Sequence, residues 1–402
     1  MYQYLREIKE KLLTTALLIC SLFFLVNFSL AADDFRWNRF RYPIARYTQK
    51  DAMVIGNNIV SFQRSSGGWG KIISPAQTFS KVDISRLITR EKAFELAFDS
   101  NAVDLYSHKV STLDNGATHS HVRFLLRIAE ATKNAEYEDA ALRGINYLLA
   151  AQLDKGGWPQ NYPNLSSYGG HVTFNDGAMT GAMKVLQEVA SGQYYFISKM
   201  VQEEADRAFF RGIDFILKSQ IVVNGVKTAW GAQHDRDNYS PIRARVYELA
   251  AISSAETVGI IKLLMSIKQP SKEVKTAIVT AVEWLNSVII FDTEIVKVYA
   301  DEYKTEYSLT AREDPNSLIP IVRFLKGRGY DNVVVTKRNA QPIWARFYDI
   351  DTQRPFFVGW SGIKKYSLNE IDLERRTGYK WYGYWPKNLL KYTWPKWKRN
   401  NL

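Results

Sequence analysis

Apolar residues recur three and four positions apart in three long segments of the chain, 52–71, 140–160 and 208–233. This spacing puts the apolar side chains on one face, so each segment is predicted to contain an amphipathic helix. A glutamine ends each helical pattern and a tryptophan follows it. The pairs are Gln63 with Trp69, Gln152 with Trp158, and Gln220 with Trp230. A fourth segment, 276–291, has the helical pattern without a glycine–tryptophan end.

A loop and a second helical pattern follow each of the three tryptophans. These second patterns span 121–132, 178–190 and 254–267. A helix pair cannot bury its apolar face without its neighbours, so the repeat predicts a mainly α-helical protein, an α/α barrel (toroid) of helix hairpins. An open solenoid is the competing architecture, but it usually has shorter and more regular periods. β-branched and aromatic residues after residue 330 predict a few short strands near the C-terminus.

Short polar segments precede the second helices. They are LDNGAT at 113–118, FNDGAM at 174–179 and RARVYEL at 243–249. Because equivalent positions of a repeat lie at the same end of a barrel, we expect Asp114, Asn115, Asp176 and Arg245 to converge on one rim.

The Asp-Asn-Gly and Asn-Asp-Gly sequences have two interpretations. Each one alone is typical of a turn or a helix N-cap, because Asx side chains accept backbone N–H groups and glycine allows positive φ. At matched positions of a repeat, Asp114 and Asp176 also predict a site for Ca²⁺, which prefers carboxylate and amide oxygens. The histidines lack zinc-like spacing, so zinc is not expected.

Arginine and histidine side chains provide further candidates for the rim. Arg243 and Arg245 precede Glu248 and could form an ordinary ion-paired cluster, but the planar guanidinium also suits carboxylate recognition. Arginine is a poor base unless its site penalises the charged form through burial or neighbouring cations. For His234, substrate hydrogen bonding or a structural role is favoured over metal ligation.

The repeated tryptophans have a core interpretation and a sugar-platform interpretation. Trp69 and Trp158 recur at one point of the repeat, as packing positions must, so we favour the core for both. Tyr162 lies in the loop after Trp158 and is a better candidate for contact with a sugar.

Residues 1–31 have the layout of a secretory signal peptide, with three basic residues before an uncharged stretch and small residues around Ala31. We predict cleavage near Ala32, a secreted or periplasmic protein, and a single catalytic domain over 32–402. The alternative is an uncleaved membrane anchor, because the uncharged stretch is nearly long enough to span a bilayer. Cys20 lies in the removed segment, so the mature chain has neither disulfides nor a cysteine nucleophile.

The chain remains basic after cleavage, because its net charge falls only from +12 to +11. Positive potential raises the local concentration of polyanions, but the cations are not gathered in blocks typical of nucleic-acid binding. Export therefore favours an acidic polysaccharide as the partner, with no nucleic acid and no stable membrane association after cleavage. We expect a monomer.

Several motifs together resemble the family 10 polysaccharide lyases, the pectate lyases with an α/α barrel. The resemblance rests on DNGAT, FNDGAM and RARVYEL, and it extends through GGWPQNYP (156–163), TAWGAQHD (228–235), WARFYDIDTQRPFF (344–357) and LERRTGY (373–379). It covers nearly all of the mature chain.

The resemblance implies cleavage of polygalacturonate by β-elimination with Ca²⁺ as cofactor, giving a 4,5-unsaturated product. It implies that Arg245 is the base that removes the C5 proton and that Asp176 is a calcium ligand. Asp114 and Asn115 would lie near the metal and the scissile sugar, and Arg346 would bind a substrate carboxylate. Arg243, His234 and Tyr162 complete the predicted substrate-binding set.

Two departures from the family pattern bear on activity. FFVGWSG stands where the family usually has an Arg-Asp pair, so Trp360 replaces a substrate-binding arginine, and GGWGKII lacks a frequent asparagine. Loss of one charged contact costs about 1.5 to 3 kcal/mol of binding. A weak or inactive pectin-binding homologue is therefore the alternative function. A glycoside hydrolase with two carboxylates is a third possibility, against which Arg245 at the rim argues.

Overall fold

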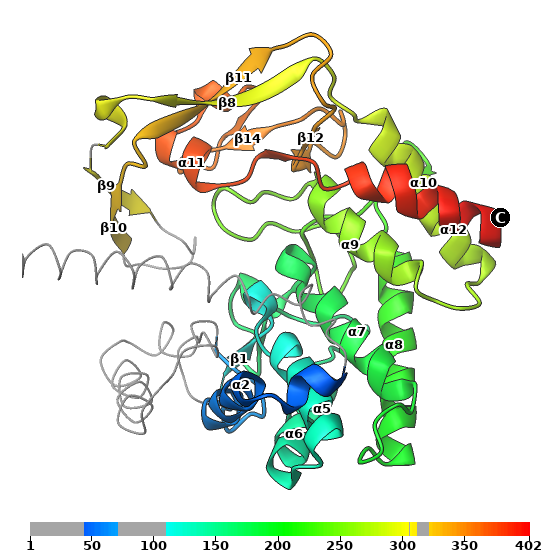
Figure 1. The fold of residues 1–402 in the computed structure, drawn as a ribbon. Helices are drawn as coiled ribbons and strands as arrows, with labels where there is room; N and C mark the ends of the chain where they lie inside the picture. The colour runs from blue at the N-terminus through cyan, green and yellow to red at the C-terminus, as the bar shows by residue number, and fades with distance from the viewer. Residues whose placement is uncertain (1–43, 71–109, 305, 312–320) are drawn as a thin grey trace, which may run out of the picture. The chain divides into compact units, whose positions relative to one another are not determined.

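The computed structural model describes residues 44–70, 110–304, 306–311 and 321–402 (Figure 1). The chain divides into two compact units. The first runs to Tyr147 and includes Tyr194–Phe196, and the second comprises Leu148–Gln193 and Ile197–Leu402. The predicted signal peptide, 1–31, lies outside the described residues. In the described part of the chain, no helix is both long enough and apolar enough to cross a membrane.

The first unit is helical, as the apolar spacing predicts. Its elements are η2 (Ile44–Thr48), α2 (Lys50–Ser61), β1 (Ser111–Thr112), η3 (Asp114–Gly116), α5 (His119–Thr132) and most of α6 (Ala135–Ala150). α5 packs against η2 and α2. Ten of the eleven positions of α5 from His119 to Ala129 are buried, which makes α5 the central helix of this unit.

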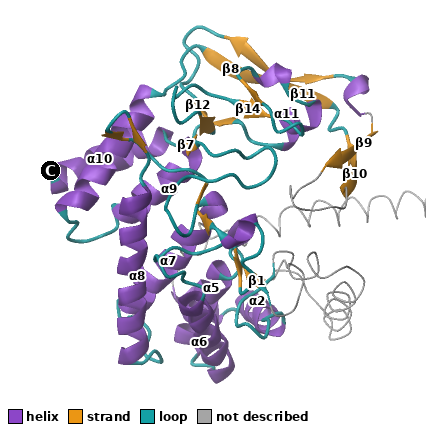
Figure 2. Ribbon diagram, turned by 180° about the vertical axis from the view of Figure 1, so that it is seen from behind, coloured by secondary structure: helices purple, strands orange, loops and turns teal. Residues whose placement is uncertain are grey.

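The second unit contains the remaining long helices. They are α7 (Ala178–Ala190), α8 (Lys199–Ser219), α9 (Ser254–Leu264), α10 (Lys272–Ser287), α11 (Leu373–Gly378) and α12 (Trp394–Asn401). Ser198 and Ser271 cap α8 and α10, because their hydroxyls accept the N–H groups of Val201 and Val274. α7 packs along α8, with α9 also against α7 (Figure 2).

The second unit also carries most of the described strands. The longest pairs are antiparallel, β8 (Thr293–Tyr299) with β11 (Tyr330–Thr336) and β9 (Glu306–Ala311) with β10 (Ile321–Lys326). The strands therefore begin before residue 330, because the alternating β-branched run TEIVKVY forms β8. Two-residue pairs form the rest: β3 (Val172–Thr173) with β6 (Gln233–His234), β4 (Val222–Val223) with β5 (Val226–Lys227), β7 (Ile252–Ser253) with β13 (Phe347–Tyr348), β12 (Trp344–Ala345) with β16 (Tyr382–Gly383), and β14 (Phe357–Val358) with β15 (Lys364–Lys365). The protein is mainly helical with mostly short strands, as predicted.

The repeated tryptophans are core anchors. Trp69, Trp158 and Trp230 are fully buried, and each indole N–H donates to a carbonyl near the end of the preceding helix. The acceptors are Ile59 at 2.7 Å, Leu148 at 2.7 Å and Ile216 at 2.8 Å. The core interpretation of Trp69 and Trp158 is confirmed.

A fourth anchor was not recognised in the sequence. The indole N–H of Trp344 donates to the carbonyl of Leu285 in α10 at 2.8 Å, and the side chain is buried. The strands β8 to β11 are inserted between these two residues, so the tryptophan is far from its helix in the sequence. The segment 276–291 is therefore part of a fourth copy.

The repeated glutamines tie each loop to the following helix. The side-chain amide of each glutamine donates to a carbonyl just before the tryptophan and to an alanine carbonyl of the next helix. Gln63 reaches Gly67 and Ala140, Gln152 reaches Gly156 and Ala208, and Gln220 reaches Thr228 and Ala277, all at 2.8 to 3.1 Å. We call the four tryptophans and three glutamines the frame.

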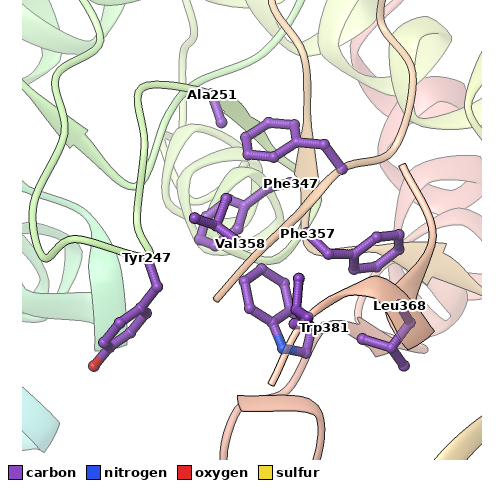
Figure 3. Close-up of a cluster of buried hydrophobic side chains, with 9 residues drawn as sticks. Tyr247, Ala251, Phe347, Phe357, Val358, Leu368 and Trp381 are labelled. Carbon is purple, nitrogen blue, oxygen red and sulfur yellow. The ribbon is translucent and has the colours of Figure 1, made fainter. Parts of the chain in front are cut away.

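An aromatic cluster holds the C-terminal segments against the loops of the second unit (Figure 3). Phe347 and Phe357 both meet the ring of Trp381 edge-on, with ring centroids 6.1 and 5.8 Å apart. Tyr247 and Ala251 bring the loop that carries Arg245 into the same cluster. The backbone of Arg346 is fixed here too, because its N–H donates to the carbonyl of Trp381 at 2.7 Å.

Candidate active site

The frame sets the register of the polar turns. The carbonyl of each of the first three tryptophans accepts a backbone N–H from the strand before the second helix: Trp69 from Thr112, Trp158 from Thr173 and Trp230 from Ser253. Three residues after these partners come Asn115, Asp176 and Glu256. The third equivalent of Asp176 is therefore Glu256 and not Arg245, which the sequence analysis placed there. A long loop before β7 displaces Arg245 from the repeat register.

Asp176 lies in η5 (Asn175–Gly177), where it has left-handed backbone angles, φ 51° and ψ 18°. Aspartate and asparagine tolerate this conformation better than most residues. Its carboxylate does not cap α7, whose N-cap is Gly177 without a side-chain hydrogen bond. The side chain is exposed, and Asn175 Nδ2 donates to Asp176 Oδ2 at 3.1 Å. The simple capping interpretation of Asp176 is thus wrong.

Arg346 connects the two polar turns of the second unit. Its Nη2 donates to Asn175 Oδ1 at 2.6 Å and pairs with Oε1 of the buried Glu256. Burial by itself lowers the pKa of Arg346, but the charges of Glu256 and Asp176 and the nearby Tyr379 raise it overall. Arg346 is therefore a permanently charged side chain between an amide and a carboxylate.

Arg245 is held by a bidentate ion pair with Glu248. Its Nε and Nη2 donate to Glu248 Oε2 and Oε1 at 2.7 and 2.6 Å, and the Glu248 side chain is 7% exposed. Burial opposes the charge of both partners, yet their hydrogen bonds raise the pKa of Arg245 and lower that of Glu248. The structure thus stabilises the guanidinium, the opposite of the condition that an arginine base requires.

Tyr379 joins the two arginines. Its hydroxyl donates to Glu248 Oε1 at 2.8 Å, and the guanidinium of Arg346 lies 5.0 Å from its ring centroid. Arg245, Arg346 and Asp176 therefore belong to one continuous set of contacts within the second unit. We call this set the charged network; its members are Asn175, Asp176, Arg245, Glu248, Glu256, Arg346 and Tyr379.

Four members of the charged network were not predicted as site residues: Asn175, Glu248, Glu256 and Tyr379. Glu256 follows Ser253 in a Ser-x-x-Glu pattern, which is a signal for a helix start. Glu248 was named only as an ion-pair neighbour of the arginines. Tyr379 lies 131 residues from its partner Glu248, so no local pattern could have linked them.

The other predicted substrate-binding residues are more dispersed. Arg243 is exposed in the loop before Arg245, and Tyr162 is half-buried in β2 (Asn161–Tyr162). His234 is fully buried; its Nε2 accepts Gly231 N–H at 2.9 Å and its Nδ1 lies 2.7 Å from the carbonyl of Tyr239. Burial lowers the pKa of His234 to about 4. A neutral ring with both nitrogens engaged inside the protein does not suit the predicted substrate contact, so we assign His234 a structural role.

Asp114 and Asn115 belong to the first unit, in η3 before α5. The backbone N–H of Asp114 donates a hydrogen bond to Thr112 Oγ1 at 3.1 Å, and the side chain of Asp114 is buried. Asn115 is exposed and has a positive φ of 50°. Asn115 thus has the same left-handed turn as Asp176 at the same repeat position. The convergence of these residues with the second unit remains a prediction.

Trp360 belongs to a second cluster beside Arg245. Its indole N–H donates to Glu374 Oε2 at 3.0 Å, and its ring meets Tyr247 edge-on at 5.3 Å. The guanidinium of Arg375 lies 4.6 Å from the Trp360 ring centroid and 4.4 Å from that of Tyr247. Arg375 is itself paired with Glu374, so its charge is already neutralised by a carboxylate.

No group of three or more His, Cys, Asp or Glu side chains within the described ranges could hold a metal ion. A divalent ion at the exposed carboxylate of Asp176 would therefore need ligands of other kinds as well.

Comparison with solved structures finds similar folds. A family 10 polysaccharide lyase from Cellvibrio cellulosa aligns with a TM-score of 0.66 and 28% identity, covering 87% of this chain and 93% of that chain. An aspartate-to-alanine mutant of a family 10 polysaccharide lyase from the same organism, in complex with trigalacturonic acid, aligns with a TM-score of 0.67 and 28% identity, covering 87% and 94%. No curated protein matches the sequence.

The family comparison covers most of the chain and both units. Residues 63–390 match the model of the pectic acid lyase family. This range contains the frame and the whole charged network. The chain therefore belongs to the pectic acid lyase family and is a polysaccharide lyase, as its motifs predicted.

Proposed function

We propose that this protein is an exported, calcium-dependent pectate lyase that cleaves polygalacturonate by β-elimination, with Arg245 as the base. The observation that carries the proposal is the charged network, in which Arg245, Arg346 and the Asp176 turn are connected within one unit. A similar family 10 lyase binds trigalacturonic acid, which supports an acidic polysaccharide as the substrate here. We further propose a closed α/α toroid, a secreted or periplasmic location and a monomer.

Arg346 is the residue that we assign to the substrate carboxylate. Its side chain is 13% exposed and its guanidinium is already fixed by Asn175 and Glu256, so binding a uronate does not require it to be ordered. A planar guanidinium is suited to a carboxylate because it can donate to two oxygens at once.

The donor set of the Asp176 turn fits Ca²⁺. Asp176 offers hard carboxylate oxygens on an exposed left-handed turn, and Ca²⁺ takes six to eight such ligands at flexible geometry. Asn175 and Glu256 direct their oxygens to Arg346, so uronate carboxylates and water must supply much of the shell. Asp176, with Asp114 from the first unit, would hold the ion. When bound, it would polarise the uronate carboxylate and so acidify the C5 proton.

The chain's own residues supply orientation and the proton acceptor. Arg346 would hold a uronate by two oxygens, and Arg245 would face the C5 proton. Hydrogen bonds from Arg245 fix it in one orientation against Glu248, so its position does not depend on substrate. Asn115 would lie beside the scissile sugar, and Arg243 and Tyr162 would contact flanking sugars.

A pectin-binding homologue with weak or no activity is the second candidate function. Two observations favour it. Glu248 stabilises the charge of Arg245, and the cation beside Trp360, Arg375, is already paired with the carboxylate of Glu374. Such a protein would keep Arg346 and the Asp176 turn for binding.

One assay separates these functions. The purified mature protein is incubated with polygalacturonate and calcium, with and without a chelator. A lyase produces ultraviolet-absorbing unsaturated ends only when calcium is present. Retention on a pectate gel without turnover would identify a binding protein, and reducing ends without unsaturation would identify a hydrolase.

A further inference from the structure

Arg245 cannot be a base in the state in which the structure holds it. A guanidinium has five N–H donors and no acceptor, so it must lose a proton before it can take one. Both of its hydrogen bonds to Glu248 stabilise the charged form, which makes release of that proton to water unfavourable. A proton acceptor in direct contact would solve this problem.

Resting on the proposed function, we propose that Glu248 accepts the proton that Arg245 must release, so that the Arg245–Glu248 pair, rather than the arginine alone, receives the C5 proton. Glu248 acts through Arg245 and is a positioning and proton-holding residue that does not touch the substrate.

The geometry of Glu248 suits this task. Its two oxygens lie 2.6 and 2.7 Å from Arg245 nitrogens, so a proton has only a hydrogen-bond length to travel. The carboxylate is buried, which weakens its solvation and reduces the energy difference between the ion pair and a neutral pair. Tyr379 donates to Oε1 at 2.8 Å and keeps the carboxylate in place in both states.

The step balances within the site. One guanidinium proton moves to a Glu248 oxygen. A water molecule then transfers a proton between two nitrogens of the neutral guanidine, so that the nitrogen facing the sugar carries the lone pair. That nitrogen takes the C5 proton, while the C5–H electron pair forms the C4–C5 double bond and the C4–O bond breaks. Water protonates the leaving oxygen, and the proton on Glu248 returns to solvent, which restores the ion pair.

Several charged or titratable groups surround the pair. Arg245 faces Glu248, and Tyr247 and Tyr379 lie close by. Glu248 also interacts electrostatically with the positive charge of Arg346. Burial raises the pKa of Glu248, but Arg245, Tyr379 and Arg346 lower it below the usual range overall. The carboxylate is therefore ionised throughout the neutral range, and transfer of the proton from Arg245 depends on their direct hydrogen bonds.

Glu248→Gln tests the proposal because two mechanisms predict opposite signs. If Arg245 worked alone, removal of the anion would ease its deprotonation, and kcat would rise at alkaline pH. If Glu248 is the proton acceptor, kcat falls by about 100-fold or more, the usual contribution of general base catalysis, while KM changes less than about threefold. A kcat within threefold of wild type, or above it, would overturn the proposal.

A matched control and a rescue separate proton transfer from structure. Arg376 and Asp331 form a bidentate pair of the same kind, at 2.8 and 2.7 Å, outside the charged network. Asp331→Asn should lower thermal stability to a degree similar to Glu248→Gln without changing kcat. Added formate should restore part of kcat in Glu248→Ala, since it can fill the place of the carboxylate; absence of rescue in a folded variant counts against the proposal.

Arg245→Ala distinguishes failure of the proposed function from failure of the role proposed for Glu248. If Arg245→Ala retains turnover, the assignment of the base fails, and the role of Glu248 fails with it. If Arg245→Ala is inactive but Glu248→Gln retains wild-type kcat, the lyase stands and only the proton-holding role of Glu248 is lost.

Discussion

The frame and the charged network use the same repeat in different ways. The frame joins neutral side chains to backbone carbonyls, and its tryptophans do so alike in all four copies, with Trp158 and Trp230 as examples. The charged network joins side chains to one another, and the repeat position from which two of its members come differs between copies. Asp176 and Glu256 occupy this position in the second unit, and Asn115 occupies it in the first. Repetition thus preserves the scaffold, while the chemistry depends on residues that occur only once.

This difference predicts that the two regions respond differently to substitution. Changes in the charged network should chiefly alter turnover or binding, and changes in the frame should chiefly lower stability.

Substitution of Arg245 is expected to have the largest effect on turnover. Both Arg245→Ala and Arg245→Lys should abolish it, by at least about 1,000-fold in kcat, because an ammonium cannot reproduce the two-point pairing with Glu248. Binding of trigalacturonate, measured by calorimetry, should be largely retained. Normal activity in Arg245→Lys would mean that the base is misassigned.

Asp176→Asn should have the next largest effect, through calcium. The amide removes one negative charge from the turn, and we expect calcium affinity to fall by about 10 to 100-fold. Calcium titration in the presence of trigalacturonate measures this directly, in an Arg245→Ala background that prevents turnover. Equal calcium affinity in Arg245→Ala and the double variant would remove Asp176 from the metal site.

Arg346→Lys should weaken substrate binding more than turnover. A lysine keeps the charge but loses the fork that bonds Asn175 and Glu256 together, at a cost of about 1.5 to 3 kcal/mol. KM should therefore rise by roughly 10 to 100-fold, since 1.4 kcal/mol is a factor of ten. A change confined to kcat would place Arg346 in proton transfer instead of carboxylate binding.

Local patterns predicted the frame better than the charged network. Trp69, Trp158 and Trp230 each follow their helix closely, so their spacing was visible, whereas Trp344 lies 59 residues from Leu285 and was missed. Arg245, Arg346 and Asp176 were identified by motif resemblance. Glu256 was missed because the loop before β7 hides its register, and the pairing of Glu248 with Tyr379 depends on tertiary structure alone.

Substitution of His234 is expected to have the smallest effect on activity. It tests whether a buried residue close to the frame affects stability and not turnover. His234 is buried four residues after Trp230, and its Nε2 accepts the N–H of Gly231. In the fourth copy the Tyr348 hydroxyl, four residues after Trp344, accepts the N–H of Ala345 in the same way. The folded-state pKa of His234 is about 4, below the unfolded value near 6.5.

The sign of the pH effect follows from proton binding. Between the two pKa values of His234 the unfolded chain binds a proton that the folded chain does not, so stability falls as pH decreases from about 6.5 to 4. The full contribution is on the order of 3 kcal/mol. His234→Tyr introduces the residue that the fourth copy has at this position. When the free energy of unfolding is measured with urea at several pH values in this range, it should change less with pH in His234→Tyr than in the wild type, while kcat at neutral pH stays within about twofold. An equal slope in both proteins would mean that His234 titrates normally in the folded state, and a large loss of kcat would return it to the substrate site.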